Sequence, residues 1–244
     1  MRISQKIRII VTFSWFYGFG VIKRGSIYVL AYLALPVSFL FLLNVLGNGK
    51  LIGFAILGGL ISIITNNSIS SIGDSVFLKL ELKLQDLLIP TRMGKQDYVL
   101  GLSFANLFFS LPGIVLYSIL SIIYNLLTLH NAVFYLISLT LLLISTSSIA
   151  FIVSSFIKHT RYSWGFATVL STFLGIIPPI YYPSTLLPSW FYYSLYAIPV
   201  TPCAVFLQGV SGLTEINYLH LVALLLETLI YYYLGVKFIK WGDE

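Results

Sequence analysis

The sequence predicts an all-α membrane protein with six transmembrane helices. Apolar residues make up 58% of its 244 residues and charged residues only 9%, whereas roughly a quarter of an ordinary soluble domain is charged. A helix that crosses about 30 Å of hydrocarbon needs roughly 20 predominantly apolar residues. The chain holds six apolar runs near or above that length. We therefore expect one transmembrane domain over residues 1–244.

The amino-terminal segment, residues 1–25, is expected to be an amphipathic helix lying along the membrane surface. Its apolar stretch Ile9–Phe19 resembles the core of a signal peptide, but no small-residue cleavage site follows it. Basic residues flank the stretch on both sides, which fits an interfacial helix better. These basic residues are Arg2, Lys6, Arg8, Lys23 and Arg24.

Six spans follow this segment and place both chain ends on the same side of the membrane. The chain has 14 Lys and Arg residues, and Lys50 is the only one in a loop predicted on the opposite side. Cytoplasmic loops carry the excess of basic residues, so both termini are expected in the cytoplasm of a multi-pass cell-membrane protein. The predicted spans are Ser26–Leu46, Leu51–Ile72, Tyr98–Leu127, Asn131–Ile157, Trp164–Ile180 and Ile216–Phe238.

The loop at residues 73–97 is the most charged segment, and its pattern fits two structures. Residues 79–85 alternate as a strand would, whereas leucines at 80, 84, 87 and 88 follow the spacing of a helix face. We favour a short helix that ends near Pro90, because an isolated strand has no sheet to join. Such a helix would present apolar side chains to a cytoplasmic partner; the alternative is a solvated linker. The residues expected to make the contact are Leu84, Leu87, Leu88 and Arg92.

The region between the fifth and sixth spans, residues 175–209, contains six of the nine prolines. This density prevents a continuous helix, so the segment is expected to form short pieces that enter the outer leaflet and return. Trp190 and the aromatic residues after it would lie at headgroup level. For the individual aromatic residues, an ordinary interfacial belt is the alternative interpretation.

Together the two loops resemble those of the permease subunit of type-2 ABC exporters, and the resemblance covers essentially the whole chain. The segment LQDLLIPTRMGKQDYVLG resembles the coupling-helix region of that family. Its features are Leu87, Leu88, Pro90 and Gly101. YYPSTLLPSW followed by IPVTP resembles the family's extracellular hairpin, through Pro183, Leu187, Pro188, Trp190, Pro199 and Pro202.

The resemblance implies an exporter built from two permeases, identical or homologous, and two separate ATPase subunits that bind ATP and Mg²⁺. This chain would then hold no cofactor, lie in membrane lipid and bind no nucleic acid. The residues implied for ATPase coupling are Leu84, Leu87, Leu88, Pro90 and Arg92. Those implied for the outer re-entrant or gating region are Pro183, Pro188, Trp190, Pro199 and Pro202.

The sequence offers little catalytic chemistry of its own. Residues 20–26 come nearest to a phosphate-binding loop, but they do not match its lysine pattern and follow no strand. His130, His159 and His220 are scattered over different segments. The single cysteine, Cys203, excludes an internal disulfide. We therefore expect a transport subunit that is not an enzyme.

Polar residues inside the predicted spans leave two interpretations open. Glu227 lies deep in the last span, where an uncompensated charge is costly, so it either lines a pathway or is a hydrogen-bonded carboxyl that joins helices. The second span carries a polar cluster that either packs helices together or lines a cavity, with packing preferred. This cluster is Asn66, Asn67, Ser68, Ser70 and Ser71.

Two other functions compete with an ATP-driven exporter. A secondary transporter or channel would work without an ATPase, and a membrane assembly factor would have no substrate path. An ATPase partner would distinguish an ATP-driven exporter from a secondary transporter or channel. A cavity, or a seam between two copies, would argue against a membrane assembly factor.

Overall fold

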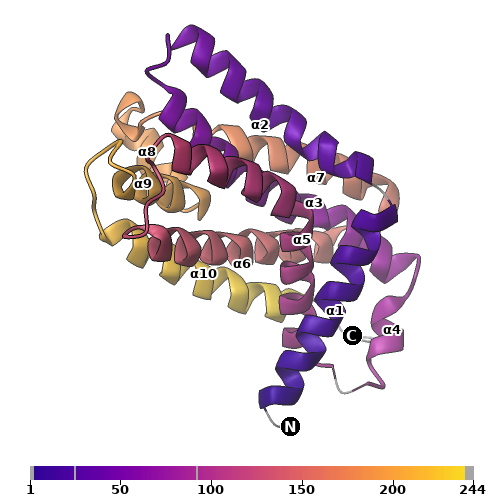
Figure 1. The fold of residues 1–244 in the computed structure, drawn as a ribbon. Coiled ribbons are helices and arrows are strands. Elements are labelled where there is room, and N and C mark those ends of the chain that lie inside the picture. The colour runs from indigo at the N-terminus through magenta and orange to yellow at the C-terminus, as the bar shows by residue number, and fades with distance from the viewer. Residues whose placement is uncertain (1–2, 25, 92, 240–244) are drawn as a thin grey trace.

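The computed structural model describes residues 3–24, 26–91 and 93–239, and these form ten α-helices and one short 3-10 helix without any strand (Figure 1). The all-α prediction is confirmed. In chain order the helices are α1 (Ile3–Arg24), α2 (Ser26–Leu46), α3 (Ile52–Leu80), α4 (Leu84–Leu88), α5 (Lys95–Ile123), α6 (Ala132–Phe156), α7 (Thr160–Ile176), η1 (Ser184–Leu186), α8 (Ser189–Leu195), α9 (Val200–Val210) and α10 (Leu219–Phe238).

Each of the six apolar runs coincides with one long helix, but two helices extend into the charged loop. α3 has 29 residues and continues to Leu80, so the alternating residues that begin at Lys79 form no strand. α5 begins at Lys95, three residues before the predicted start at Tyr98. The loop between α3 and α5 therefore shrinks to a short connection that contains α4.

α3 is the central helix, and α2, α5, α6, α7 and α9 all pack against it. Almost every residue from Gly53 to Val76 is buried. Glycines allow aromatic rings to approach its backbone closely. A Cβ atom on Gly59 would lie 2.1 Å from the Tyr117 ring, and one on Gly58 would lie 2.3 Å from the Tyr181 ring. Both rings are fully buried in the main core.

The bundle has two different ends, which we call the α4 end and the α9 end. At the α4 end, α1 crosses the long helices steeply, while α8 and α9 lie at the opposite end (Figure 1). An apolar cluster at the α4 end joins α1, the end of α3, α4, the start of α5 and the segment after α10. Within the described residues, α2, α3, α5, α6, α7 and α10 run back and forth between these ends.

Four helices, α3, α5, α6 and α10, are long and apolar enough to cross a membrane. The pair α8 and α9 meets the same test jointly but is bent by 108°. α7 has 17 residues, about 25 Å of helix, and the described apolar part of α2 is Leu33–Leu46. The chain is thus a multi-pass helical membrane protein, and its described residues hold four or five candidate spans where the sequence predicts six.

Candidate functional site

α4 is a five-residue helix held between two sharply defined connections. Before it, Lys83 adopts a left-handed conformation with φ of 48°. After it, the Thr91 hydroxyl donates to the Leu88 carbonyl at 2.6 Å and accepts from the Met93 N–H at 3.2 Å. The Gly94 N–H then donates to the Asp97 carboxylate at 3.1 Å and caps α5. These bonds shape the chain on the carboxyl-terminal side of α4 and at the start of α5.

The leucines of α4 do not all face outward, which differs from the expectation of a fully exposed apolar face. Leu84 and Leu88 pack into the cluster at the α4 end, and Gln85 between them is buried. Leu87, one residue before Leu88 and therefore rotated by about 100°, is 67% exposed. Pro90 is exposed, and Arg92 lies outside the described residues.

The exposed apolar surface at this end is formed by Leu87 and residues that the sequence did not single out. Leu82 precedes α4 and Ile89 follows it, and both side chains are exposed. Leu80, at the end of α3, is exposed as well. Exposed leucine and isoleucine side chains in a charged loop form a small apolar surface suited to a protein partner. We call Leu82, Leu87 and Ile89 the α4 surface.

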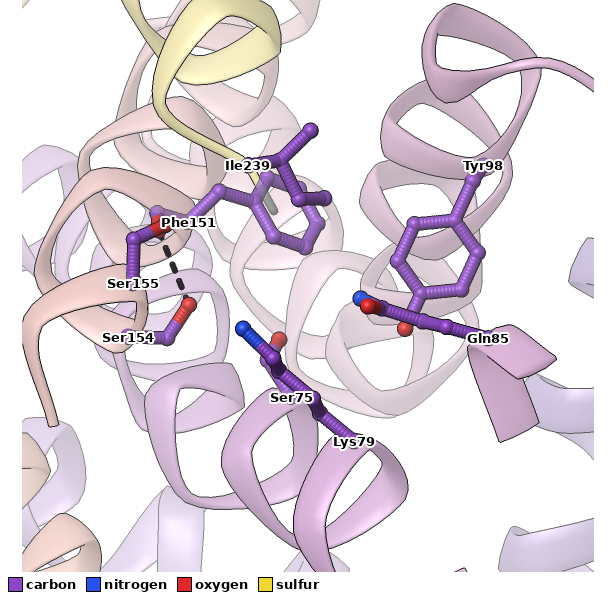
Figure 2. A pocket seen from close by; sticks show the side chains of 8 residues that line it. All are labelled: Ser75, Lys79, Gln85, Tyr98, Phe151, Ser154, Ser155 and Ile239. Carbon is purple, nitrogen blue, oxygen red and sulfur yellow. Dashed lines mark hydrogen bonds between the residues drawn. The ribbon is translucent and has the colours of Figure 1, made fainter. Parts of the chain in front are cut away.

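A small polar cavity lies directly behind α4 (Figure 2). Its volume of about 10 Å³ is close to what one water molecule needs. In Figure 2 the Gln85 amide lies against the Tyr98 hydroxyl, and the Lys79 amine points toward the serines of α6. The lining residues are Ser75, Lys79, Gln85, Tyr98, Phe151, Ser154, Ser155 and Ile239. Side chains of α3, α4, α5 and α6 thus form the wall of one cavity.

The polar cluster of the second predicted span divides into two groups. Asn67, Ser68 and Ser71 are buried, and Asn67 donates to the Ser110 hydroxyl of α5 at 2.8 Å. The Asn67–Ser110 bond joins α3 to α5, as the packing interpretation predicts, whereas the Ser71 hydroxyl donates to the Ser68 carbonyl within α3. Asn66 and Ser70 are only partly buried.

Asn66 and Ser70 begin a polar stripe on α3, because Asp74 follows them at the same helical spacing and is also partly buried. Every other residue of α3 from 53 to 76 is buried. A Cβ atom on Gly175 of α7 would lie 2.8 Å from the Asn66 side-chain oxygen, so the stripe runs beside α7. Asp74 lies beyond residue 72, where the predicted span ends, so the sequence did not indicate that it belongs to this stripe.

At the α9 end, the prolines act mainly as helix starts. Pro183, Pro188 and Pro199 occupy the position directly before η1, α8 and α9. Pro202 lies in the first turn of α9, where proline is tolerated. Trp190 is 75% exposed on α8. The predicted break into short pieces is present, and it places α8 and α9 at 108° to each other.

Hydrogen bonds hold this bent pair in place. The Thr201 hydroxyl donates to the Leu195 carbonyl at 2.7 Å, across the bend. The Gln208 amide donates to the Pro179 carbonyl at 2.7 Å and to the Tyr182 carbonyl at 3.3 Å. Residues 200–209 are all buried. α9 is therefore tightly packed in the bundle, while α8 beside it remains largely exposed.

Glu227 faces the bend from α10. Tyr231, one turn further along α10, donates from its hydroxyl to the Ala197 carbonyl at 2.7 Å, and His220 hydrogen-bonds the Tyr196 hydroxyl. Glu227 lies near both tyrosines. Its Oε2 atom is buried without a hydrogen-bond partner in the described part of the chain. Glu227 thus lies between the two contacts that tie the bend to α10.

Among residues 3–24, 26–91 and 93–239, no three His, Cys, Asp or Glu residues are grouped as metal ligands would be. The features that remain are the exposed apolar α4 surface, the polar stripe on α3 and the bent pair of α8 and α9. Comparison with models of known protein families gives no match, and comparison with curated proteins gives no relative.

Proposed function

We propose that this chain is the transmembrane subunit of an ATP-binding-cassette exporter. It forms half of a substrate path with a second permease and couples to a separate ATPase that binds ATP and Mg²⁺. All six long helices cross the cell membrane, α1 lies along the cytoplasmic surface, and both chain ends are cytoplasmic. The bend of α8 and α9 is a re-entrant element of the outer leaflet.

The α4 surface carries this proposal. Leu87 is available to an ATPase subunit, while Gln85 and Leu88 on the opposite side of α4 anchor it to the bundle. Side chains of α3, α5 and α6 line the cavity behind α4 together with Gln85, so a force applied to Leu87 would pass to the bundle through Gln85 and Leu88. A solvated linker needs neither a buried anchor nor an exposed apolar surface.

The polar stripe of α3 supports a path between two copies. Polar and acidic side chains in a membrane helix face protein or a water-filled cavity, because lipid exposure is costly. The stripe runs beside α7, and both α2 and α7 carry large apolar side chains on their outer surfaces, so a second copy that packs on these two helices would enclose the stripe. The exposed residues are Val37, Phe41, Leu42, Val45 and Leu46 on α2, and Tyr162, Trp164, Phe166, Val169 and Phe173 on α7.

The experiment that tests the proposal is purification in mild detergent with the Leu87→Asp variant. We expect the native chain to recover an ATPase subunit and the variant to lose it by about tenfold or more, as for a central interface residue. Leu129→Asp is the matched control, because Leu129 is 94% exposed in the connection between α5 and α6.

Failure to recover any ATPase, together with intact transport by the Leu87→Asp variant, would overturn the exporter mechanism. A secondary transporter is then the second candidate. The buried, unpartnered Oε2 of Glu227 favours it, since carboxyl groups inside membranes serve ion-coupled transport. Transport by that mechanism would stop with Glu227→Gln and would not require ATP. An assembly factor would show neither ATPase binding nor transport.

A further inference from the structure

An open groove of about 470 Å³ separates α1 from the connection between α4 and α5. One wall is a single face of α1, and the other is the segment that leaves α4. The lining residues are Arg8, Ile9, Thr12, Phe13 and Phe16 on α1, and Leu88, Thr91 and Met93 on the opposite wall. Its volume lies within the usual range of small-molecule sites.

The groove is polar at one end and apolar along the rest of its length. Among the residues that the structure describes, Arg8 is the only charged one lining the groove. Phe16 lies eight residues further along α1, about 12 Å away. Thr91 uses its hydroxyl within the α4 connection. A ligand that matches this groove therefore has an anionic head and an extended apolar tail.

The position of α1 identifies the environment of the groove. On α1, the groove residue Phe16 is 79% exposed. The exposed apolar side chains that lie outside the groove are Val11, Trp15 and Phe19. α1 contains basic residues but no acidic residue. A helix with exposed aromatic residues and basic charge, attached to a bundle of membrane spans, lies at the boundary of lipid headgroups and acyl chains. At this boundary the groove can meet both the headgroup and the acyl chains of an anionic lipid.

We propose that the groove binds one anionic phospholipid, with its phosphate on Arg8 and one acyl chain along Phe13 and Phe16. The acyl chain packs on Leu88, the last residue of α4, and on Met93 in the connection that follows it. The bound lipid thereby joins α1 to the α4 end. The proposal rests on the membrane location of the chain and does not depend on an ATPase partner.

The test uses a tryptophan reporter in the groove. Replacing the four native tryptophans by phenylalanine and introducing Phe16→Trp leaves one fluorophore at the apolar end. The protein is placed in phosphatidylcholine nanodiscs that contain a tenth of phosphatidylglycerol with brominated chains, and quenching is compared with that by brominated phosphatidylcholine at the same fraction. We expect quenching by phosphatidylglycerol to be about fivefold more effective, the scale of one basic contact with an anionic lipid.

Arg8→Gln should remove this preference, Arg8→Lys should retain most of it, and Lys50→Gln is the control because Lys50 is exposed at the other end of the bundle. Equal quenching by both lipids in the Arg8 protein would overturn the anionic site. No quenching by either lipid would show that protein, such as a second copy or a partner subunit, covers the groove, and would overturn the proposal as a whole.

A second measurement avoids any change in the native tryptophans. Native mass spectrometry of the unmodified chain after mild delipidation should retain one phosphatidylglycerol, and Thr12→Trp should lose it, because the indole would fill the groove while Arg8 remains. Thr185→Trp, at an exposed position beside α8, should retain it. Retention by Thr12→Trp would show that the lipid binds elsewhere.

Discussion

The α4 end and the α9 end of the bundle are held together in different ways. At the α9 end, ten consecutive residues of α9 are buried, and side-chain amide and hydroxyl groups bond directly to backbone carbonyls. At the α4 end, a five-residue helix rests on a small polar cavity and exposes Leu87 beside an open groove. The comparison shows that α9 is packed on all sides by the bundle, whereas the α4 end leaves apolar side chains exposed.

Gly58→Ala should give the largest loss of stability, because it acts on the close packing of the α9 end. The added Cβ would lie 2.3 Å from the Tyr181 ring and 2.8 Å from the Ile180 carbonyl oxygen. We expect a cost of about 3 kcal/mol, at the upper end for overpacking. The free energy of unfolding in mixed micelles measures it.

Gly165→Ala is the matched control, because nothing lies within 4 Å of the added Cβ and the position is helical. It should be neutral or stabilising by up to about 1 kcal/mol. Equal destabilisation by both variants would show that the α9 end is packed more loosely than its contacts imply.

The same substitution at two buried glutamines compares the two ends directly. Gln208→Leu removes the donor from the Pro179 and Tyr182 carbonyls, and we expect a loss of about 2 kcal/mol. Gln85→Leu should cost about 1 kcal/mol, because a water molecule in the adjoining cavity can replace the amide. Unfolding titrations of the two variants test the order, and a larger cost for Gln85→Leu would reverse the comparison.

Two neighbouring leucines test which side of α4 belongs to the bundle. Leu88 packs in the apolar cluster and is partly buried, so Leu88→Ala should cost about 1 kcal/mol, less than at a fully buried site. Leu87→Ala should change stability by less than about 0.5 kcal/mol. Both are measured by the same unfolding titration. Similar losses at the two positions would mean that Leu87 is covered by the chain itself and is not free for a partner.

The sequence was sufficient to predict the long helices, because uninterrupted apolar runs leave little choice of structure in a membrane. All six runs became helices, and the proline-rich segment broke into short helices. The number of membrane crossings was harder to predict, since hydropathy does not fix where a helix ends. α7 ends at Ile176, four residues before the predicted end of its run at Ile180.

The candidate site was predicted only in part. The leucine spacing located α4 correctly, but five residues with three leucines do not determine which side faces the bundle. The rotation of α4 about its axis depends on packing against a cluster that includes Met93, Tyr98 and Ile239. These residues lie outside α4, on separate parts of the chain. Gln85 was not expected to be buried because polar residues in a charged loop usually lie in water. A single glutamine between leucines was the only local signal for the buried anchor.

Single cysteines at exposed positions should have the smallest effect on stability. They also test on which side of the membrane each end of the bundle lies. Lys50→Cys lies in the connection between α2 and α3 at the α9 end, and Lys158→Cys lies between α6 and α7 at the α4 end. Each should change stability by less than about 0.5 kcal/mol. An impermeant maleimide added to intact cells should label Lys50→Cys alone, and permeabilised cells should allow both to react. The parent chain provides the background, because Cys203 is buried.

A third cysteine, Thr185→Cys, decides whether α7 crosses the membrane. Thr185 is exposed and follows α7, so it should be labelled from outside together with Lys50→Cys if α7 spans the bilayer. Local thinning of the bilayer would make a helix of 17 residues sufficient. Labelling from the same side as Lys158→Cys would mean that α7 turns back within the membrane. In that case α8 and α9 would not lie in the outer leaflet, because the six-span arrangement puts them on the side of the membrane that α7 reaches.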